Sequence, residues 1–139
     1  MNIEHVDKSS LIVEKERGLA MEIPKIFESE YKFCEILWDN EPVSSSELVR
    51  LCIERLECKK STTYTVIKRL SERGVIKSED AIVTSLVSRE EVQIAESTEV
   101  VERSFAGSLP GFIAAFTKGK KLTQQEIQEI QAIIDAHKE

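Results

Sequence analysis

Apolar side chains recur every three or four positions in the first half of the chain and predict three helices there. In residues 28–39 they form a broad stripe that ends at Trp38, so this helix is expected to bury one face. A second helix is expected at residues 44–56 and a third at residues 60–73, each with an apolar face of its own.

Local signals mark the ends of the second and third helices. Ser44 and Glu47 have the spacing of a capping box, in which a serine side chain caps the helix and an acidic side chain reaches back to the cap. Gly74 stands where a C-terminal glycine cap is expected, just after the basic residues Arg69 and Arg73. These signals predict two consecutive helices joined by a short turn.

The periodicity changes after Gly74. Residues 75–76 and 81–87 are rich in β-branched and apolar side chains and flank the polar residues 78–80, which predicts two strands around a tight turn. Three helices followed by a hairpin are typical of a winged helix-turn-helix. The expected fold class is therefore mainly α with a small β-hairpin: a winged helix-turn-helix followed by a C-terminal helical dimerisation segment.

The rest of the chain predicts more helix. A helix is expected from Ser88 to about Phe105, a short one at residues 111–116, a loop at residues 118–121, and a last helix that begins at a capping box formed by Thr123 and Glu126. Together these segments carry more apolar surface than a small domain hides alone, so we expect a homodimer. The alternative is that they cover the winged-helix core. The residues expected in the dimer contact are Leu109, Phe112, Ile113, Phe116, Ile127, Ile130 and Ile134.

The chain is expected to divide into three parts. Residues 1–21 contain a short apolar run but no start signal for a stable element apart from Ser9 or Ser10 as a helix cap, so we interpret them as an extension. Residues 22–88 form the winged helix, and residues 89–139 form the helical dimerisation domain.

Composition and charge narrow the class of protein. The chain has 139 residues, and 41% of them are hydrophobic. Its net charge of −6 excludes a protein that coats nucleic acid in bulk and a polybasic membrane-binding protein. It contains no apolar run of about 18 residues, so we expect no membrane insertion. The N-terminus lacks the apolar core of a signal peptide, and the three cysteines are odd in number and far apart. We therefore expect a reducing, cytoplasmic location.

Positive charge is concentrated in one stretch of this acidic chain. Residues 59–77 contain six basic residues and one acidic residue, a net charge of +5, and most of them lie in the third predicted helix. Such a cluster meets the phosphate requirement of DNA binding, and hydroxyl side chains on the polar face of that helix can reach base edges. The alternative is a solvated helix face. The residues expected to bind DNA are Lys59, Lys60, Ser61, Thr62, Tyr64, Thr65, Lys68 and Arg69.

Other chemistry has little support in the sequence. The two histidines, His5 and His137, lie near opposite ends, and we find no glycine-rich phosphate loop, catalytic triad or clustered metal ligands. We therefore expect no enzyme, no cofactor and no metal site. Cys34 and Cys52 fall on apolar helical faces and are expected to pack in the core, whereas Cys58, beside two lysines, is an alternative site for a redox-sensing thiol.

Several sequence segments together resemble the penicillinase repressor family of winged-helix regulators. They are residues 35–38 with the terminal tryptophan, residues 61–70 with the following glycine, residues 104–109, and the tail from Leu122. The resemblance covers residues 23–139. It implies a homodimeric repressor whose winged helix reads a palindromic double-stranded operator and whose C-terminal helices form the dimer. It also aligns Ser61, Thr62 and Thr65 with base-reading positions.

The sequence departs from this family at informative positions. The expected wing is short and carries Glu79 and Asp80 at its tip, where family wings are often basic. An acidic tip repels phosphate, so we expect no wing contact in the minor groove. The tail has no cysteine, which excludes copper sensing through a Cys-x-Cys cluster. The bond that family proteases cut aligns with Ala115–Phe116, where alanine replaces the usual asparagine; the implied partner is an inactivating membrane-bound sensor protease.

Two hypotheses follow. The first is a dimeric, sequence-specific DNA-binding transcriptional repressor. The second is a protein-interaction module built on a degenerate winged helix, favoured by the acidic total charge and the acidic wing.

Overall fold

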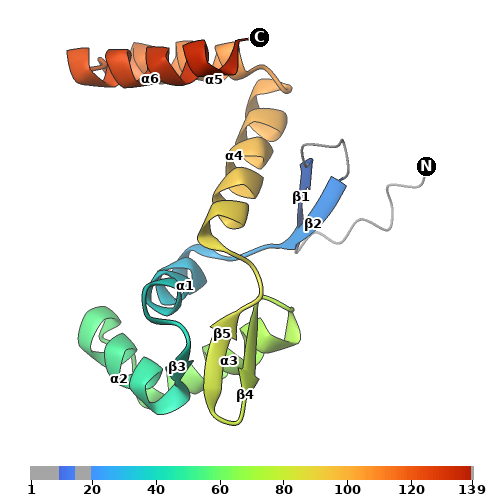
Figure 1. The fold of residues 1–139 in the computed structure, drawn as a ribbon, viewed down its shortest axis with the longest axis vertical. Helices are drawn as coiled ribbons and strands as arrows, with labels where there is room; N and C mark the ends of the chain where they lie inside the picture. Colours follow the sequence, from blue (N-terminus) through green and yellow to red (C-terminus); the bar gives the residue numbers. More distant parts are fainter. Residues whose placement is uncertain (1–9, 15–19, 139) are drawn as a thin grey trace. The chain divides into compact units, whose positions relative to one another are not determined.

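The computed structural model describes residues 10–14 and 20–138. The chain forms two compact units, Met1–Glu99 and Val100–Glu139. Figure 1 labels their helices and strands in chain order.

Three helices form the core of the first unit: α1 (Glu28–Asn40), α2 (Ser45–Leu56) and α3 (Lys60–Glu72). They confirm the three helices expected from periodicity, within one or two residues at each end. Each places apolar side chains from one face in a common core, as amphipathic spacing requires. Among the most buried side chains are Leu37 of α1, Leu48 of α2 and Leu70 of α3.

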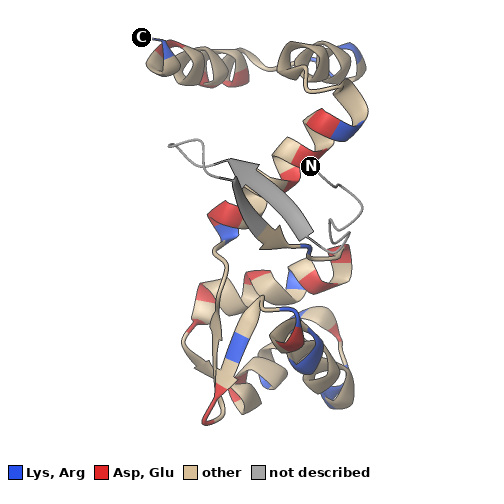
Figure 2. Ribbon diagram, turned by 90° about the vertical axis from the view of Figure 1, so that its right-hand side faces the viewer, with Lys and Arg blue, Asp and Glu red and all other residues tan. Residues whose placement is uncertain are grey.

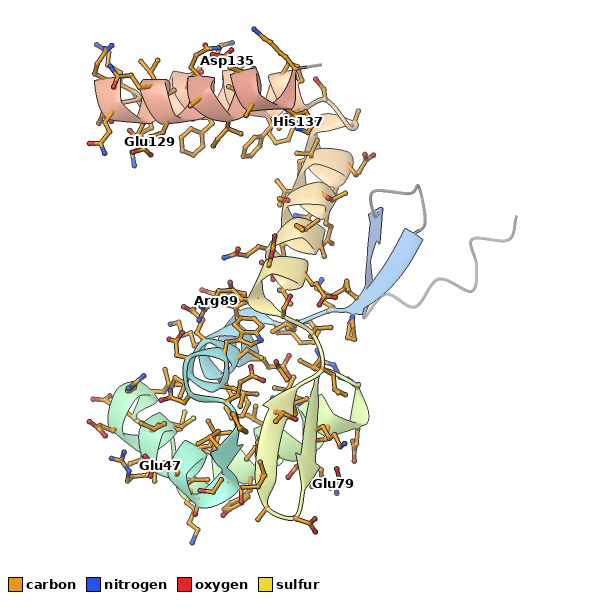
Figure 3. All side chains as sticks on the ribbon, in the orientation of Figure 1. Glu47, Glu79, Arg89, Glu129, Asp135 and His137 are labelled. Carbon is orange, nitrogen blue, oxygen red and sulfur yellow. The ribbon has the colours of Figure 1, made fainter. Side chains whose placement is uncertain are left out.

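The predicted cap of α2 is half formed. The Ser44 hydroxyl accepts a hydrogen bond from the backbone N–H of Glu47 at 3.2 Å, as expected. The Glu47 side chain, however, pairs with Arg50 at 2.6 Å instead of reaching back to the cap (Figure 3). Arg50 also pairs with Glu54 at 3.0 Å, so the charge of this guanidinium is balanced by two acidic side chains of the same helix.

A three-stranded antiparallel sheet completes this unit, with β3 (Val43–Ser44), β4 (Ile76–Glu79) and β5 (Ile82–Ser85) in the order β3-β5-β4. The expected hairpin is confirmed, but its turn is Asp80–Ala81 and not residues 78–80. Both turn residues have positive φ, 52° and 62°, as a two-residue turn matching strand twist requires. The sequence did not predict β3, because two residues are too short to show alternation.

Helix α4 (Arg89–Phe105) begins against α1. The Trp38 indole N–H donates to the Val87 carbonyl at 3.0 Å, and the Arg89 guanidinium lies 5.4 Å from the Trp38 ring centroid (Figure 3). Arg89 also pairs with Asp39 at 2.7 Å. Ser88 caps the helix as predicted, and Val92 is buried in the core of the first unit.

The described residues near the N-terminus form two strands that no start signal in the sequence predicted. Strand β1 (Ser10–Glu14) pairs antiparallel with β2 (Ala20–Pro24), with Ile12 opposite Glu22. Ser10 therefore begins a strand and does not cap a helix; Ser9 lies outside the described residues. The apolar run in β1 is β-branched and short, which suits a paired strand better than a helix.

The second unit contains α5 (Leu109–Gly119) and α6 (Gln124–His137). The capping box of Thr123 and Glu126 is confirmed, with bonds of 3.0 and 2.8 Å in its two directions. Helix α5 is longer than expected: Lys118 and Gly119 are helical, and the loop begins at Lys120. Lys118 lies in the last turn, where a cation stabilises the negative end of the helix dipole.

Neither α5 nor α6 buries a side chain. Phe112 packs edge-on against Phe105 at 5.4 Å between ring centroids, which is an aromatic contact at the surface of this unit. Most of the larger apolar side chains of the two helices are exposed: Leu109, Ile113, Phe116, Ile127, Ile133 and Ile134.

Candidate nucleic-acid interface

Helix α3 separates the predicted DNA-binding side chains from the core. Thr63, Ile67 and Leu70 point inward and are buried. The outward face agrees with the prediction that hydroxyl and basic groups share one side of this helix. Its exposed side chains are Lys60, Ser61, Thr62, Tyr64, Thr65, Lys68 and Arg69, followed by one acidic residue, Glu72, in the last turn.

The hydroxyl groups of α3 differ in what they offer to a ligand. Thr65 donates its hydroxyl proton to the Ser61 carbonyl one turn back, at 3.0 Å. Its methyl group and the oxygen lone pairs then remain for a partner. Thr63 makes the same kind of bond to the Lys59 carbonyl at 3.3 Å, but its side chain is buried in the core and cannot reach a ligand.

The turn between α2 and α3 places positive charge at the start of α3. Glu57 ends α2 in the left-handed conformation, with φ of 55°, and the chain then turns directly into α3. Lys59 is the N-cap of α3 and Lys60 its first residue, and both are exposed. The Lys59 side chain makes no capping hydrogen bond. Because the N-terminus of a helix carries a partial positive charge, the two lysine charges add to it.

Figure 2 shows Lys and Arg on α3 and acidic residues at the tip of the β4–β5 hairpin. Lys77 of β4 pairs with Glu79 on the same strand at 2.7 Å. The hydrogen bond from Lys77 lowers the pKa of Glu79, and the reciprocal bond raises the pKa of Lys77. The hairpin tip therefore carries an internally paired lysine and the exposed Asp80, so it has no positive charge to offer a phosphate.

A buried carboxylate that the sequence analysis did not identify lies beneath one end of α3. Glu30 of α1 is 1% exposed, and both of its carboxylate oxygens are hydrogen-bonded. Oε1 accepts from the Phe27 backbone N–H at 3.0 Å, and Oε2 accepts from Arg69 Nε at 3.1 Å. Arg73 reaches both oxygens through one Nη atom, at 3.0 and 2.8 Å.

This network changes the role expected for Arg69. The sequence predicts a DNA contact, and the structure adds an ion pair between its guanidinium and a carboxylate 39 residues earlier in the chain. Burial by itself raises the pKa of Glu30, but the Phe27 N–H bond, the Arg73 bond and the two guanidinium charges outweigh it and lower that pKa overall. Glu30 is therefore held as a carboxylate. Its spacing from Phe27, as the third residue of a helix, was the one local signal.

The three cysteines differ in burial, and the two that the sequence places in the core, Cys34 and Cys52, are buried there. Burial, the largest cause in each case, raises the pKa of these thiols to about 12 and about 11. The half-buried Cys58 thiol donates a long bond, 3.8 Å, to the Leu56 carbonyl.

Within residues 10–14 and 20–138, no group of three His, Cys, Asp or Glu side chains is placed to hold a metal ion. In the same described residues, no helix combines the length and apolarity needed to cross a membrane.

Comparison with known proteins places this arrangement in a family. The chain is 20% identical over 120 residues to the penicillinase repressor of Bacillus licheniformis, an alignment that covers 84% of this chain and 94% of that protein. It is 24% identical over 111 residues to the penicillinase repressor of Staphylococcus aureus, covering 77% and 88% of the two chains. The methicillin resistance regulatory protein MecI of Staphylococcus aureus is 24% identical over 115 residues, with 80% and 94% covered.

By their names, these relatives are repressors and a regulatory protein. The sequence model of the penicillinase repressor family matches residues 26–136, which run from the end of the N-terminal hairpin almost to the end of α6. With the helical fold and the outward polar face of α3, this match shows that the chain belongs to the penicillinase repressor family.

Proposed function

We propose that this protein is a homodimeric, sequence-specific DNA-binding repressor of the penicillinase-repressor type. The observation that carries the proposal is α3, whose inward face is buried in the core and whose outward face combines hydroxyl groups with exposed lysines. A helix of this kind fits the major groove of B-form DNA.

The two kinds of side chain on α3 have separate tasks. Ser61, Thr62 and Thr65 lie near its N-terminal half and would contact base edges, where the threonine methyl groups pack against thymine methyls. Lys59, Lys60 and Lys68 would bind backbone phosphates and set the orientation of the helix. Because the tip of the β4–β5 hairpin is acidic, this wing would not attract DNA phosphate.

The second unit supports a dimer. No side chain of helices α5 and α6 is fully buried in the single chain. The large apolar side chains of Phe116, Ile127 and Ile134 are each about half exposed. Apolar surface of this extent is characteristic of a protein-protein contact. Two-fold symmetry then presents two α3 helices to half-sites about one helical turn, roughly 34–36 Å, apart, which matches a palindromic operator.

A sensor protease is a candidate inactivating partner. Ala115 and Phe116 are exposed, but both lie inside α5, so a protease would have to unwind part of that helix to reach the bond between them. A gene for a membrane-bound sensor metallopeptidase beside this one would support that route of induction, and incubation of the two proteins followed by mass determination would test it.

A salt titration tests the proposed function. Binding of the full chain to duplex DNA is measured by mobility shift between about 50 and 200 mM salt. A repressor that neutralises several phosphates shows a steep fall in affinity with salt, and a palindromic sequence selected from a random pool binds more tightly than unselected DNA. A protein-interaction module shows no binding to either duplex, and that result would reject the proposal.

A further inference from the structure

The ion-pair network beneath α3 holds more positive charge than it needs. Arg73 bridges both oxygens of Glu30 and donates through its other Nη atom to the Lys25 carbonyl. Arg73 would therefore give this buried carboxylate a charged partner even without Arg69. Arg69 is a second guanidinium on the same carboxylate. One carboxylate and two guanidinium groups leave a net charge of +1 within this network.

The two arginines differ in exposure. The Arg73 side chain is 21% exposed and lies mostly within the protein, whereas the Arg69 side chain is 51% exposed. Within the described part of the chain, the hydrogen bond of the Arg69 side chain is the one that its Nε atom donates to Glu30. A guanidinium has two hydrogen-bonding edges, so the edge formed by the two Nη atoms is left for another anion.

We propose that Glu30 is a positioning residue for the DNA contact, which it serves by accepting a hydrogen bond from Arg69 Nε and so directing the Nη edge of Arg69 at a backbone phosphate. The inference rests on the proposed function and adds to it a buried residue that never touches DNA. The chemistry favours a phosphate, because its oxygens match the paired N–H groups of that edge.

The same geometry explains why Arg69 suits this position better than lysine. A lysine ammonium keeps the charge but has no planar group that can bind Glu30 along one edge and a phosphate along the other. The side chain of an unanchored arginine also loses more rotamer freedom on binding than one that Glu30 already holds.

Four variants and a pair of control variants test the proposal in the full chain. The probe is a random-sequence duplex of about 30 base pairs, long enough for both halves of a dimer, because unselected DNA reports phosphate contacts. The variants are Arg69→Gln, Arg69→Lys, Glu30→Gln and the double variant Glu30→Gln with Arg69→Gln. Lys68→Gln, made alone and with Glu30→Gln, is the matched control because it removes a neighbouring exposed charge that has no bond to Glu30.

Arg69→Gln is expected to weaken binding about tenfold and to reduce the salt slope by about one unit. With glutamine at position 30, the further change Arg69→Gln should alter affinity within about twofold, since the arginine is no longer directed, while Lys68→Gln keeps its full effect. Arg69→Lys should bind as weakly as Arg69→Gln. Should Glu30→Gln fail to fold, Glu30→Asp replaces it, because aspartate keeps the charge and withdraws the carboxylate from Arg69.

Two results would overturn the positioning role. One is an equal loss from Arg69→Gln in both backgrounds, which means that Glu30 only supports the fold. The other is wild-type affinity in Arg69→Lys, which means that charge suffices without the fixed edge. Failure of the proposed function is seen separately, as a wild-type protein that does not bind the duplex at low salt.

Discussion

At the scale of single residues, hydrogen bonds within α3 determine which atoms of its side chains are left to contact DNA. The Thr65 hydroxyl proton is taken by the Ser61 carbonyl, so the methyl group is the more distinctive feature that this side chain can offer to a base. Bonds of this kind from serine or threonine to the carbonyl one turn back often bend a helix slightly. The contact expected of Thr65 is therefore apolar, with a thymine methyl.

This assignment predicts different results for two substitutions at one position. Thr65→Ala removes the methyl and should weaken binding to a selected operator by roughly 1–3 kcal/mol, whereas Thr65→Val keeps it and should bind nearly as wild type. Thr62→Ala should weaken binding by a similar amount. Fluorescence anisotropy with an operator selected by the wild-type protein measures each affinity.

Thr98→Ala is the control for that series, because Thr98 is an exposed α4 residue whose hydroxyl is also bonded to a carbonyl in its own helix. It should leave affinity unchanged. Equal binding by Thr62→Ala, Thr65→Ala and wild type would remove both threonines from the base-reading face.

The buried carboxylate predicts a pH dependence of stability. Because its neighbours lower the pKa of Glu30 in the folded chain below the ordinary value of 4.5, Glu30 contributes stability above about pH 4.5, and that contribution is lost as the pH falls through the lowered pKa. Urea unfolding of wild type and Glu30→Gln between pH 7 and pH 3 measures it. The difference between the two proteins should be largest at pH 7 and should shrink in acid; a difference independent of pH would contradict this origin.

At the scale of elements, the β4–β5 hairpin is the part of the winged helix whose charge opposes DNA. Glu79 is paired with Lys77, so Glu79→Lys removes an acid and also releases a lysine. Glu79→Lys combined with Asp80→Lys should therefore raise affinity for unselected DNA if the hairpin lies near the phosphate backbone. Mobility shift at low salt measures the effect.

The same charge change in the other unit provides the control. Glu129→Lys with Asp135→Lys alters exposed residues of α6 (Figure 3) and should affect DNA binding less than the hairpin variant. Equal gains from both pairs would show that total charge, and not the position of the hairpin, sets the affinity.

At the scale of the whole molecule, the second unit leaves most of its larger apolar side chains exposed, which is the basis of the proposed dimer. Phe116 is 48% exposed in the single chain, on a helix that buries nothing. Phe116→Asp places a charge in the proposed dimer contact and should shift the protein to monomer. Loss of the second half-site contact should lower operator affinity more than about tenfold, because each α3 loses the high effective concentration that the dimer provides.

Sedimentation and an operator titration on the same samples test this prediction. Gln128→Asp, which adds the same charge at an exposed polar position of α6, should remain dimeric and bind normally. A Phe116→Asp protein that stays dimeric would place the contact elsewhere in the chain.

The amino-acid sequence by itself determined the features that depend on near neighbours. Spacing of apolar residues predicted all three helices of the winged helix, and caps such as Thr123 with Glu126 marked helix starts within a residue. The positive stretch of residues 59–77 and the polar face of α3 were also visible in the sequence. Helical periodicity and capping act over three or four residues, so a linear pattern contains them.

The tertiary structure alone decided the features that join distant segments. It pairs β3 with β5, and it brings Glu30 to Arg69 and Arg73, 39 and 43 residues later. In the sequence, Glu30 is one acidic residue in the first turn of a helix, and Arg69 is one of the six basic residues in residues 59–77. Only the packing of α1 and α3 in a shared core buries that carboxylate, and burial makes a charged partner necessary, because an isolated charge is costly to remove from water.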